Sequence, residues 1–218
     1  MSLTSSVIDI SQSIDATTAC FPGTPLFQKQ LLQSVADTGV LNLTAFSMNP
    51  HIGTHADAPS HVCGNLETSP SIAIGTAPLE PYIGPAQVID LSPFTHEITV
   101  DHIKTKLPPN KPLAPRLLIR TQPTVRPHVF EDEYAYLSPE VAQWFADQGG
   151  VLIGLDTHSV DHIHSKTMDA HHALIKAGLV WLENLDLTHA PPGHYTLSAL
   201  PLKFMELEAS PVRAVLLK

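Results

Sequence analysis

The stretch HIGTHADAPSH, residues 51–61, carries three histidines and an aspartate around a glycine and a proline. A helix through this stretch is unfavourable, because Gly53 and Pro59 both oppose it and Asn49-Pro50 marks a boundary just ahead. An extended chain would project the four polar side chains to one side, but ten steps of about 3.3 Å would spread them over about 33 Å. We therefore expect the segment to bend, most readily at Gly53 and Pro59.

Such a bend would let His51, His55 and Asp57 converge, with His61 a little apart. Imidazole nitrogens and a carboxylate, without thiolates, suit Zn²⁺, Mn²⁺ or Fe²⁺. Three protein ligands leave a coordination position open, which is typical of catalytic metal sites. The alternative is a loop of solvated histidines. That alternative explains a single histidine better, whereas a metal site explains the whole set better.

A second carboxylate stands out in LVWLENLDL, residues 179–187, which we interpret as a strand. The residues that share one side of this strand with Glu183 are Leu179, Trp181, Leu185 and Leu187. A buried carboxylate is costly unless a cation or strong donors compensate its charge. A metal ion would do so directly, and the alternative is an Arg or Lys partner.

The helix predicted just before this strand, at about residues 167–177, carries the adjacent histidines His171 and His172. Neighbouring helix positions point about 100° apart, so only one of the two can face inward. His171 lies on the apolar face of the helix and His172 on the polar face. We expect His171 to lie near Glu183, and two such His/carboxylate pairs predict two metal ions. The alternative for His171 is a partly buried ring bonded to a backbone carbonyl.

Further polar residues lie within the run DTHSVDHIHSK, which begins at the end of another predicted strand. We interpret His158, His162 and His164 as members of a solvated loop and assign them no role. Asp156 and Asp161 are interpreted as turn or cap residues.

The composition argues against several classes of protein. A formal net charge of −9, with 12 Lys and Arg and no basic run, argues against a nucleic-acid partner. No apolar run approaches the roughly 18 residues of a transmembrane helix, and the first residues lack the features of a secretory signal. We expect a cytoplasmic protein without a membrane partner, in which Cys20 and Cys63 are reduced.

The apolar pattern indicates a β-rich core. Strands are predicted at residues 7–11, 41–48, 87–91, 116–121, 151–156, 179–187 and 211–218. A further helix is predicted from Ser138, as N-cap, through Pro139 to the glycines at 149–150. Because nothing in the 218 residues resembles a linker, we expect one α/β domain, residues 1–218, with a mixed sheet and a few helices.

The segment HIGTHADAPSH also fits the pattern H-x-G-T-H-x-D-x-P-x-H, and in this the chain resembles the cyclase-type metal hydrolases, which include the bacterial kynurenine formamidases and the isatin hydrolases. The resemblance to the formamidases extends to FPGTP, VIDLS, GLDTHSVD, SKTMDAHHAL, LENLDL, PPGHYTLSALPLK and SPVRAVLL. It implies a swivelling β/β/α fold, a homodimer, and two divalent metal ions per subunit, most often Zn²⁺, with Mn²⁺ as an alternative.

The resemblance implies roles for individual residues. The implied metal ligands are His51, His55, Asp57, His171 and Glu183, with the two carboxylates bridging the ions. His61 would be the proton donor and acceptor. Phe21 would contact the substrate. It stands where these formamidases usually have a tryptophan, which leaves the substrate specificity open because phenylalanine lacks the indole N–H.

The implied reaction is hydrolysis of the formamide of N-formyl-L-kynurenine to L-kynurenine and formate, a step of tryptophan degradation. The nearest alternative is a hydrolase of a related cyclic amide or ester, such as isatin or a lactone. A non-catalytic metal-binding protein is less favoured, because such a protein would have no need of His61. A further departure from the formamidase pattern DTPSVDP is that His158 and His162 replace its two prolines.

Overall fold

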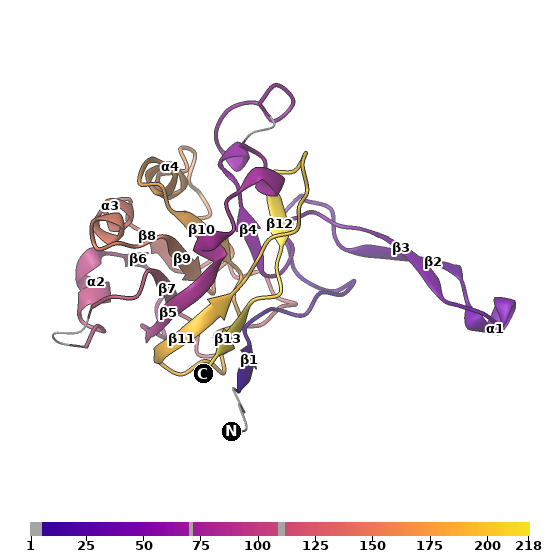
Figure 1. The fold of residues 1–218 in the computed structure, drawn as a ribbon, viewed down its shortest axis with the longest axis horizontal. Helices are drawn as coiled ribbons and strands as arrows, with labels where there is room; N and C mark the ends of the chain where they lie inside the picture. The colour runs from indigo at the N-terminus through magenta and orange to yellow at the C-terminus, as the bar shows by residue number, and fades with distance from the viewer. Residues whose placement is uncertain (1–5, 70–71, 109–111) are drawn as a thin grey trace.

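The computed structural model describes residues 6–69, 72–108 and 112–218, which are built around a nine-stranded sheet (Figure 1). In spatial order its strands are β1 (Val7–Asp9), β13 (Val215–Leu217), β11 (Gly193–Ser198), β5 (Ile83–Asp90), β7 (Arg116–Arg120), β9 (Leu152–Leu155), β10 (Val180–Glu183), β4 (His55–Asp57) and β12 (Ala209–Pro211). Strands β5, β7, β9 and β10 are parallel, and the pairs on either side are antiparallel. This mixed sheet confirms the predicted α/β class.

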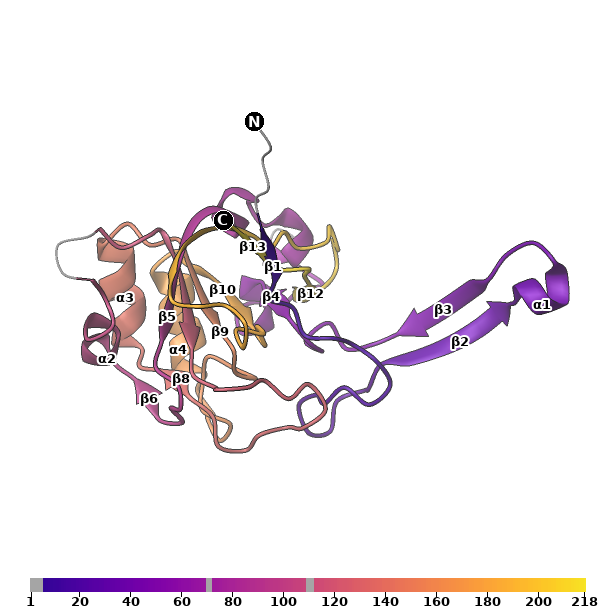
Figure 2. The same cartoon turned by 90° about the horizontal axis from the view of Figure 1, so that it is seen from below.

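Three helices lie on one side of the sheet, namely α2 (Val100–Lys104), α3 (Glu140–Asp147) and α4 (Asp169–Lys176) (Figures 1 and 2). They enclose a buried apolar cluster that includes Phe145 of α3, Leu174 of α4 and Trp181 of β10. Helix α3 begins later than predicted, because Pro139 and not Ser138 is the N-cap residue. Its end agrees with the prediction, since Gly149 follows with a positive φ of 81°.

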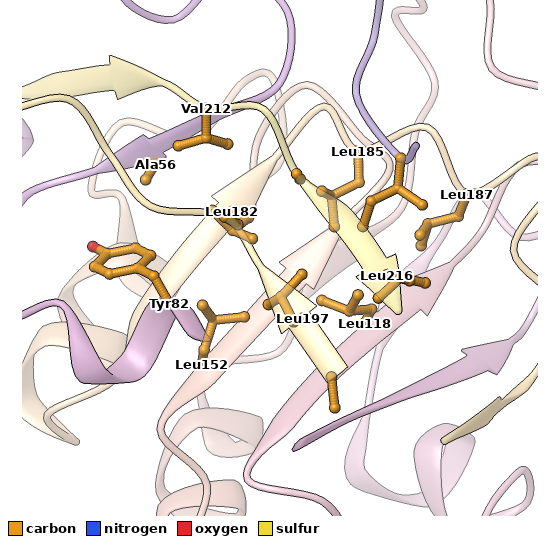
Figure 3. Packing of buried hydrophobic residues seen from close by; sticks show 14 of the residues in the cluster. Ala56, Tyr82, Leu118, Leu152, Leu182, Leu185, Leu187, Leu197, Val212 and Leu216 are labelled. Carbon is orange, nitrogen blue, oxygen red and sulfur yellow. The ribbon is translucent and has the colours of Figure 1, made fainter. Parts of the chain in front are cut away.

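The other face of the sheet holds a second apolar cluster (Figure 3). Leu197 and Leu216 come from one end of the strand order, and Ala56 of β4 comes from near the other end. The sheet must therefore curl for these side chains to meet. This curl brings β4 and β10, which carry the predicted metal ligands, into the well-packed part of the molecule.

Strand β10 is shorter than predicted. It ends at Glu183, and Asn184 has a φ of 55°, in the left-handed region. Beyond Asn184 the alternation of side chains shifts, so that Leu185 and Leu187 pack in the cluster of Figure 3 while Trp181 packs in the other cluster. The prediction that Glu183 shares one strand face with the two following leucines is therefore wrong.

An arm projects from the body, and in Figure 2 it extends well beyond the other elements. It consists of β2 (Gln28–Gln33), α1 (Val35–Thr38) and β3 (Leu43–Ser47), and its two strands pair only with each other within the described residues. The strand predicted at 41–48 thus exists, but outside the central sheet.

The remaining regular elements are small. A two-stranded sheet is formed by β6 (Glu97–Ile98) and β8 (Tyr136–Leu137), and short 3-10 helices lie at η1 (Pro59–His61), η3 (Ile74–Thr76) and η4 (Glu80–Tyr82). Among the elements described, no helix combines the length and the apolar character needed to cross a bilayer.

Candidate metal centre

The histidine-rich segment bends at both predicted places. Gly53 has a φ of 66°, which glycine adopts without strain. Strand β4 follows, and Pro59 then begins the 3-10 helix that ends at His61. Between the bends, β4 pairs with β10 in a register that sets His55 opposite Glu183. Two segments distant in sequence are thereby aligned at one point of the sheet.

At this point two carboxylates face two histidines. His55 Nε2 lies 3.3 Å from Asp57 Oδ1 and 3.4 Å from Glu183 Oε2. His171 Nε2, which α4 brings in, lies 3.6 Å from Asp57 Oδ2 and 3.5 Å from Glu183 Oε1. Each carboxylate therefore directs one oxygen to each histidine, an arrangement suited to bridging two ions.

His51 and His61 complete the cluster. His51 Nδ1 lies 3.0 Å from Asp57 Oδ1, and the ring of His61 lies 4.4 Å from that of His51 and 5.4 Å from that of His171. His51, Asp57 and His61 offer ligand atoms within 4.8 Å of one another, as do His55, Asp57 and Glu183. The structure thus brings all six predicted residues together, and His61 lies closer to the others than predicted.

The orientation of the rings fits a metal centre. His55 Nδ1–H donates to the carbonyl of Gly53 at 2.9 Å, and His171 Nδ1–H donates to Asp161 Oδ2 at 2.6 Å. Each Nε2 lone pair is then directed at the carboxylates, and both Nε2 atoms and Asp57 Oδ1 are buried without a hydrogen-bond partner among the described residues. Acceptors that face one another in a buried site are stabilised by a proton or a cation between them, and this donor set fits divalent ions.

The electrostatics of the cluster also favour a bound cation. Burial opposes charge on the ring of His55, yet Asp57 and Glu183 raise its pKa to about 10. Burial likewise opposes charge on His171, but Asp161 and Asp57 raise its pKa to about 10. Glu183 forms no ion pair with Lys or Arg in the described part of the chain. The alternative of an Arg or Lys partner for Glu183 is therefore not supported.

Asp161 is a site residue that the sequence pattern does not reveal. Its carboxylate accepts hydrogen bonds at 3.0 Å from the backbone N–H groups of Ala170 and His171, at the start of α4. The predicted capping role thus exists, but Asp161 also fixes the ring of His171. No local capping pattern could have revealed it, since these partners lie nine and ten residues away.

Two further donors hold the carboxylates. Trp181 Nε1–H donates to Asp57 Oδ2 at 3.1 Å, and the backbone N–H of Val160 donates to Glu183 Oε1 at 2.8 Å. These bonds leave the other oxygen of each carboxylate directed at His55. The carboxylates are thereby oriented before any ligand binds.

A cavity of about 510 Å³ opens onto the cluster, and Phe21, His61 and Glu183 all line it. Phe21 packs edge-on against Phe130 at 5.4 Å, and Phe130 stacks on His158 with ring centres 4.3 Å apart. One wall of the cavity is therefore aromatic. Phe21 lies where contact with a substrate is possible, while the sequence carried no signal for Phe130.

The interpretation of the DTHSVDHIHSK loop as solvated is wrong for His158. His158 is not solvated but half-buried in the cavity wall, and the exposed His162 also lines the cavity. Asp156 lies in a bend after β9, as expected, but its side chain is buried and accepts hydrogen bonds from the backbone N–H groups of Thr121 and Gln122. Burial raises the pKa of Asp156 to about 6 despite these bonds. His164 is exposed, as expected.

Comparisons with known proteins agree with this geometry. The sequence model of the Cyclase family, described as "Putative cyclase", matches residues 8–162. The kynurenine formamidase of Bordetella petrii is 38% identical over 211 residues, which are 95% of this chain and 96% of that protein.

Solved structures show the same fold. An isatin hydrolase bound to the product analogue thioisatinate has a TM-score of 0.81 at 21% identity and covers 98% of this chain and 92% of its own. A predicted metal-dependent hydrolase from Bacillus stearothermophilus has a TM-score of 0.78 at 24% identity, with 98% of both chains covered. The fold implied by the sequence resemblance is thus confirmed.

Proposed function

This chain belongs to the cyclase family, and from that premise we propose that it hydrolyses the formamide of N-formyl-L-kynurenine to L-kynurenine and formate. The observation that carries the proposal is the convergence of six polar residues beneath a cavity with an aromatic wall. A hydrophobic ring wall beside a cluster of metal-binding groups suits an aryl amide. The 38% identity to a kynurenine formamidase over almost the whole length supports the same substrate.

The ligand set is proposed as the resemblance implies it. His51, His55 and Asp57 would hold one divalent ion, His171 would hold the second, and Asp57 and Glu183 would supply ligand oxygens to both. Zn²⁺ suits these nitrogen and oxygen ligands, and Mn²⁺ is the alternative. When bound, such ions supply Lewis-acid catalysis and an activated water nucleophile.

His61 moves the proton in the proposed reaction. Burial lowers the pKa of His61, which keeps its ring neutral and able to accept a proton from the attacking water. A C–O bond forms at the formyl carbon and the C–N bond breaks. The departing aryl amine takes the proton back from His61, which returns to its neutral form.

The nearest alternative substrate is a cyclic amide such as isatin, which the same groups could open. The likeness to an isatin hydrolase is one of fold, at 21% identity, whereas the formamidase relative is 38% identical. A metal-binding protein without activity would not need the cavity beside His61. We therefore favour the formamide of N-formyl-L-kynurenine over isatin as the substrate.

The test is a hydrolysis assay on N-formyl-L-kynurenine and on isatin, before and after chelation. We expect formamide hydrolysis to be the faster reaction, to be lost on chelation, and to return when Zn²⁺ or Mn²⁺ is added back. Faster opening of isatin would replace the substrate assignment. Absence of hydrolysis with any added metal would show that the chain is not a hydrolase of this kind.

We also propose that the chain forms one domain and acts as a homodimer in the cytoplasm. Pairing of β1 with β13 unites the two ends of the chain in one sheet, which supports a single domain. Cys20 and Cys63 are both unpaired, which suits a reducing compartment. The exposed apolar residues of the arm, such as Leu31 and Phe46, support the dimer.

A further inference from the structure

The residue after Glu183 occupies an unusual position in the cavity. In a strand, successive side chains point to opposite faces, so Glu183 and Asn184 would be expected to diverge. The φ of 55° at Asn184 removes this alternation, and both side chains line the same cavity. Left-handed conformations of residues other than glycine are uncommon and concentrate at functional sites.

The backbone of Asn184 is held firmly in this conformation. Its N–H donates to the carbonyl of Thr157 at 2.9 Å, and its own carbonyl accepts from Thr54 Oγ1 at 2.5 Å. Thr54 belongs to the histidine-rich segment, and Thr157 follows β9. The turn at Asn184 is therefore tied to two segments that also build the metal centre.

His158 fixes which way the amide of Asn184 points. The backbone N–H of Glu131 donates to His158 Nε2 at 3.1 Å, and a nitrogen that accepts a hydrogen bond carries no hydrogen. The neutral ring then carries its hydrogen on Nδ1, which lies 2.9 Å from Asn184 Oδ1. Burial lowers the pKa of His158, in agreement with a neutral ring.

The remaining atom of the amide is a free donor. Since Oδ1 accepts from His158, the hydrogens of Asn184 Nδ2 are left over, and no described residue accepts them. Asn184 lines the cavity together with His61 and Glu183. A fixed donor with no partner, beside the groups that carry the chemistry, is placed to bind an acceptor on the substrate.

We infer that Asn184 Nδ2–H donates a hydrogen bond to the carbonyl oxygen of the reacting acyl group, and that His158 is the positioning residue that aims it. This inference rests on the proposed hydrolysis. When water adds to the formyl carbon, the C=O electron pair moves onto the oxygen, which becomes negative until the C–N bond breaks. A donor aimed at that oxygen binds more strongly in the transition state, so it acts mainly on kcat.

The first test uses the variant Asn184→Gly, because glycine accepts the left-handed backbone and removes only the amide. We expect kcat on N-formyl-L-kynurenine to fall about ten- to hundredfold, with KM changed by less than about threefold. Metal content and melting temperature should remain those of the wild type. Asn65→Gly, in an exposed loop, is the matched control and should leave kcat unchanged.

The second test uses His158→Phe, which preserves the ring stacked on Phe130 and removes the bond to Asn184. We expect part of the same loss in kcat. The double variant with Asn184→Gly should be no slower than Asn184→Gly alone, because His158 acts through that amide. Additive losses would overturn the positioning role, and a kcat for Asn184→Gly within about twofold of wild type would overturn the donor role.

These results are distinguishable from a failure of the proposed function. A wild-type protein inactive on the formamide but active on isatin would refute the substrate, and the same variants would then be measured on isatin. The predicted fall in kcat applies there too, because the reacting carbonyl is the same kind of acceptor. Inactivity on both substrates would refute the hydrolysis and the donor role together.

Discussion

In three histidines of the site, the hydrogen-bond partner of one ring nitrogen determines whether the other nitrogen is a donor or a lone pair. His55 and His171 donate from Nδ1 to a carbonyl and a carboxylate, so Nε2 is left as a lone pair for a cation. His158 accepts at Nε2 from a backbone N–H, so its Nδ1 becomes a donor to Asn184. The same residue type thus serves as ligand or as positioning group according to one hydrogen bond.

His61 differs from these residues because no hydrogen bond to its ring is described, and it borders the cavity. We expect His61→Ala to abolish turnover while metal content stays near that of the wild type, because the proposed role is proton transfer and not ligation. Activity assays combined with metal analysis test this. His164→Ala, at an exposed position, is the control. A variant that loses one metal ion would make His61 a ligand instead, and full activity would leave it without a role.

At the scale of elements, the sequence pattern predicts features that depend on neighbouring residues. It does not predict features that depend on contacts between distant segments. The helical pattern correctly turned His171 inward, and the glycine and proline of the histidine-rich segment marked its bends. The end of β10 was missed because the left-handed turn at Asn184 is held by Thr54, 130 residues away. The roles of Asp161 and His158 were missed for the same reason, since their partners come from other segments.

The placement of helix α4 also depends on a contact with another segment, the hydrogen bonds that its first turn donates to Asp161. Asp161→Asn should weaken the hold on the first turn of α4 and on His171, and we expect metal affinity to fall by about 10–100-fold. Titration of the apoprotein with Zn²⁺ measures this change. Asp169→Asn, exposed in the first turn of the same helix, removes the same charge and should have little effect. Equal affinities for the two variants would show that Asp161 does not orient His171.

On the scale of the whole molecule, packing against the central sheet does not account for the stability of the arm. A two-stranded ribbon is marginally stable by itself, yet β2 and β3 project away from the central sheet (Figure 2). Its register pairs Leu31 with Thr44 and Lys29 with Phe46, which puts Leu31 and Phe46 on one face. They are 60% and 67% exposed. Lys29 and Thr44 share this face, but Leu32, Val40 and Leu43 of the arm are exposed as well. Apolar surface gathered in this way is expected to be covered by another chain.

The proposed homodimer supplies that cover, and the arm gives a direct test of it. We expect Leu31→Lys and Phe46→Lys, separately and together, to convert a dimer into a monomer, because each places a charge in an apolar interface. Light scattering with size-exclusion chromatography measures the mass, and circular dichroism checks the fold. Leu202→Lys, a 53% exposed position on the body, is the control and should remain dimeric. A wild-type monomer would refute the dimer, and a dimer that survives both arm substitutions would place the interface elsewhere.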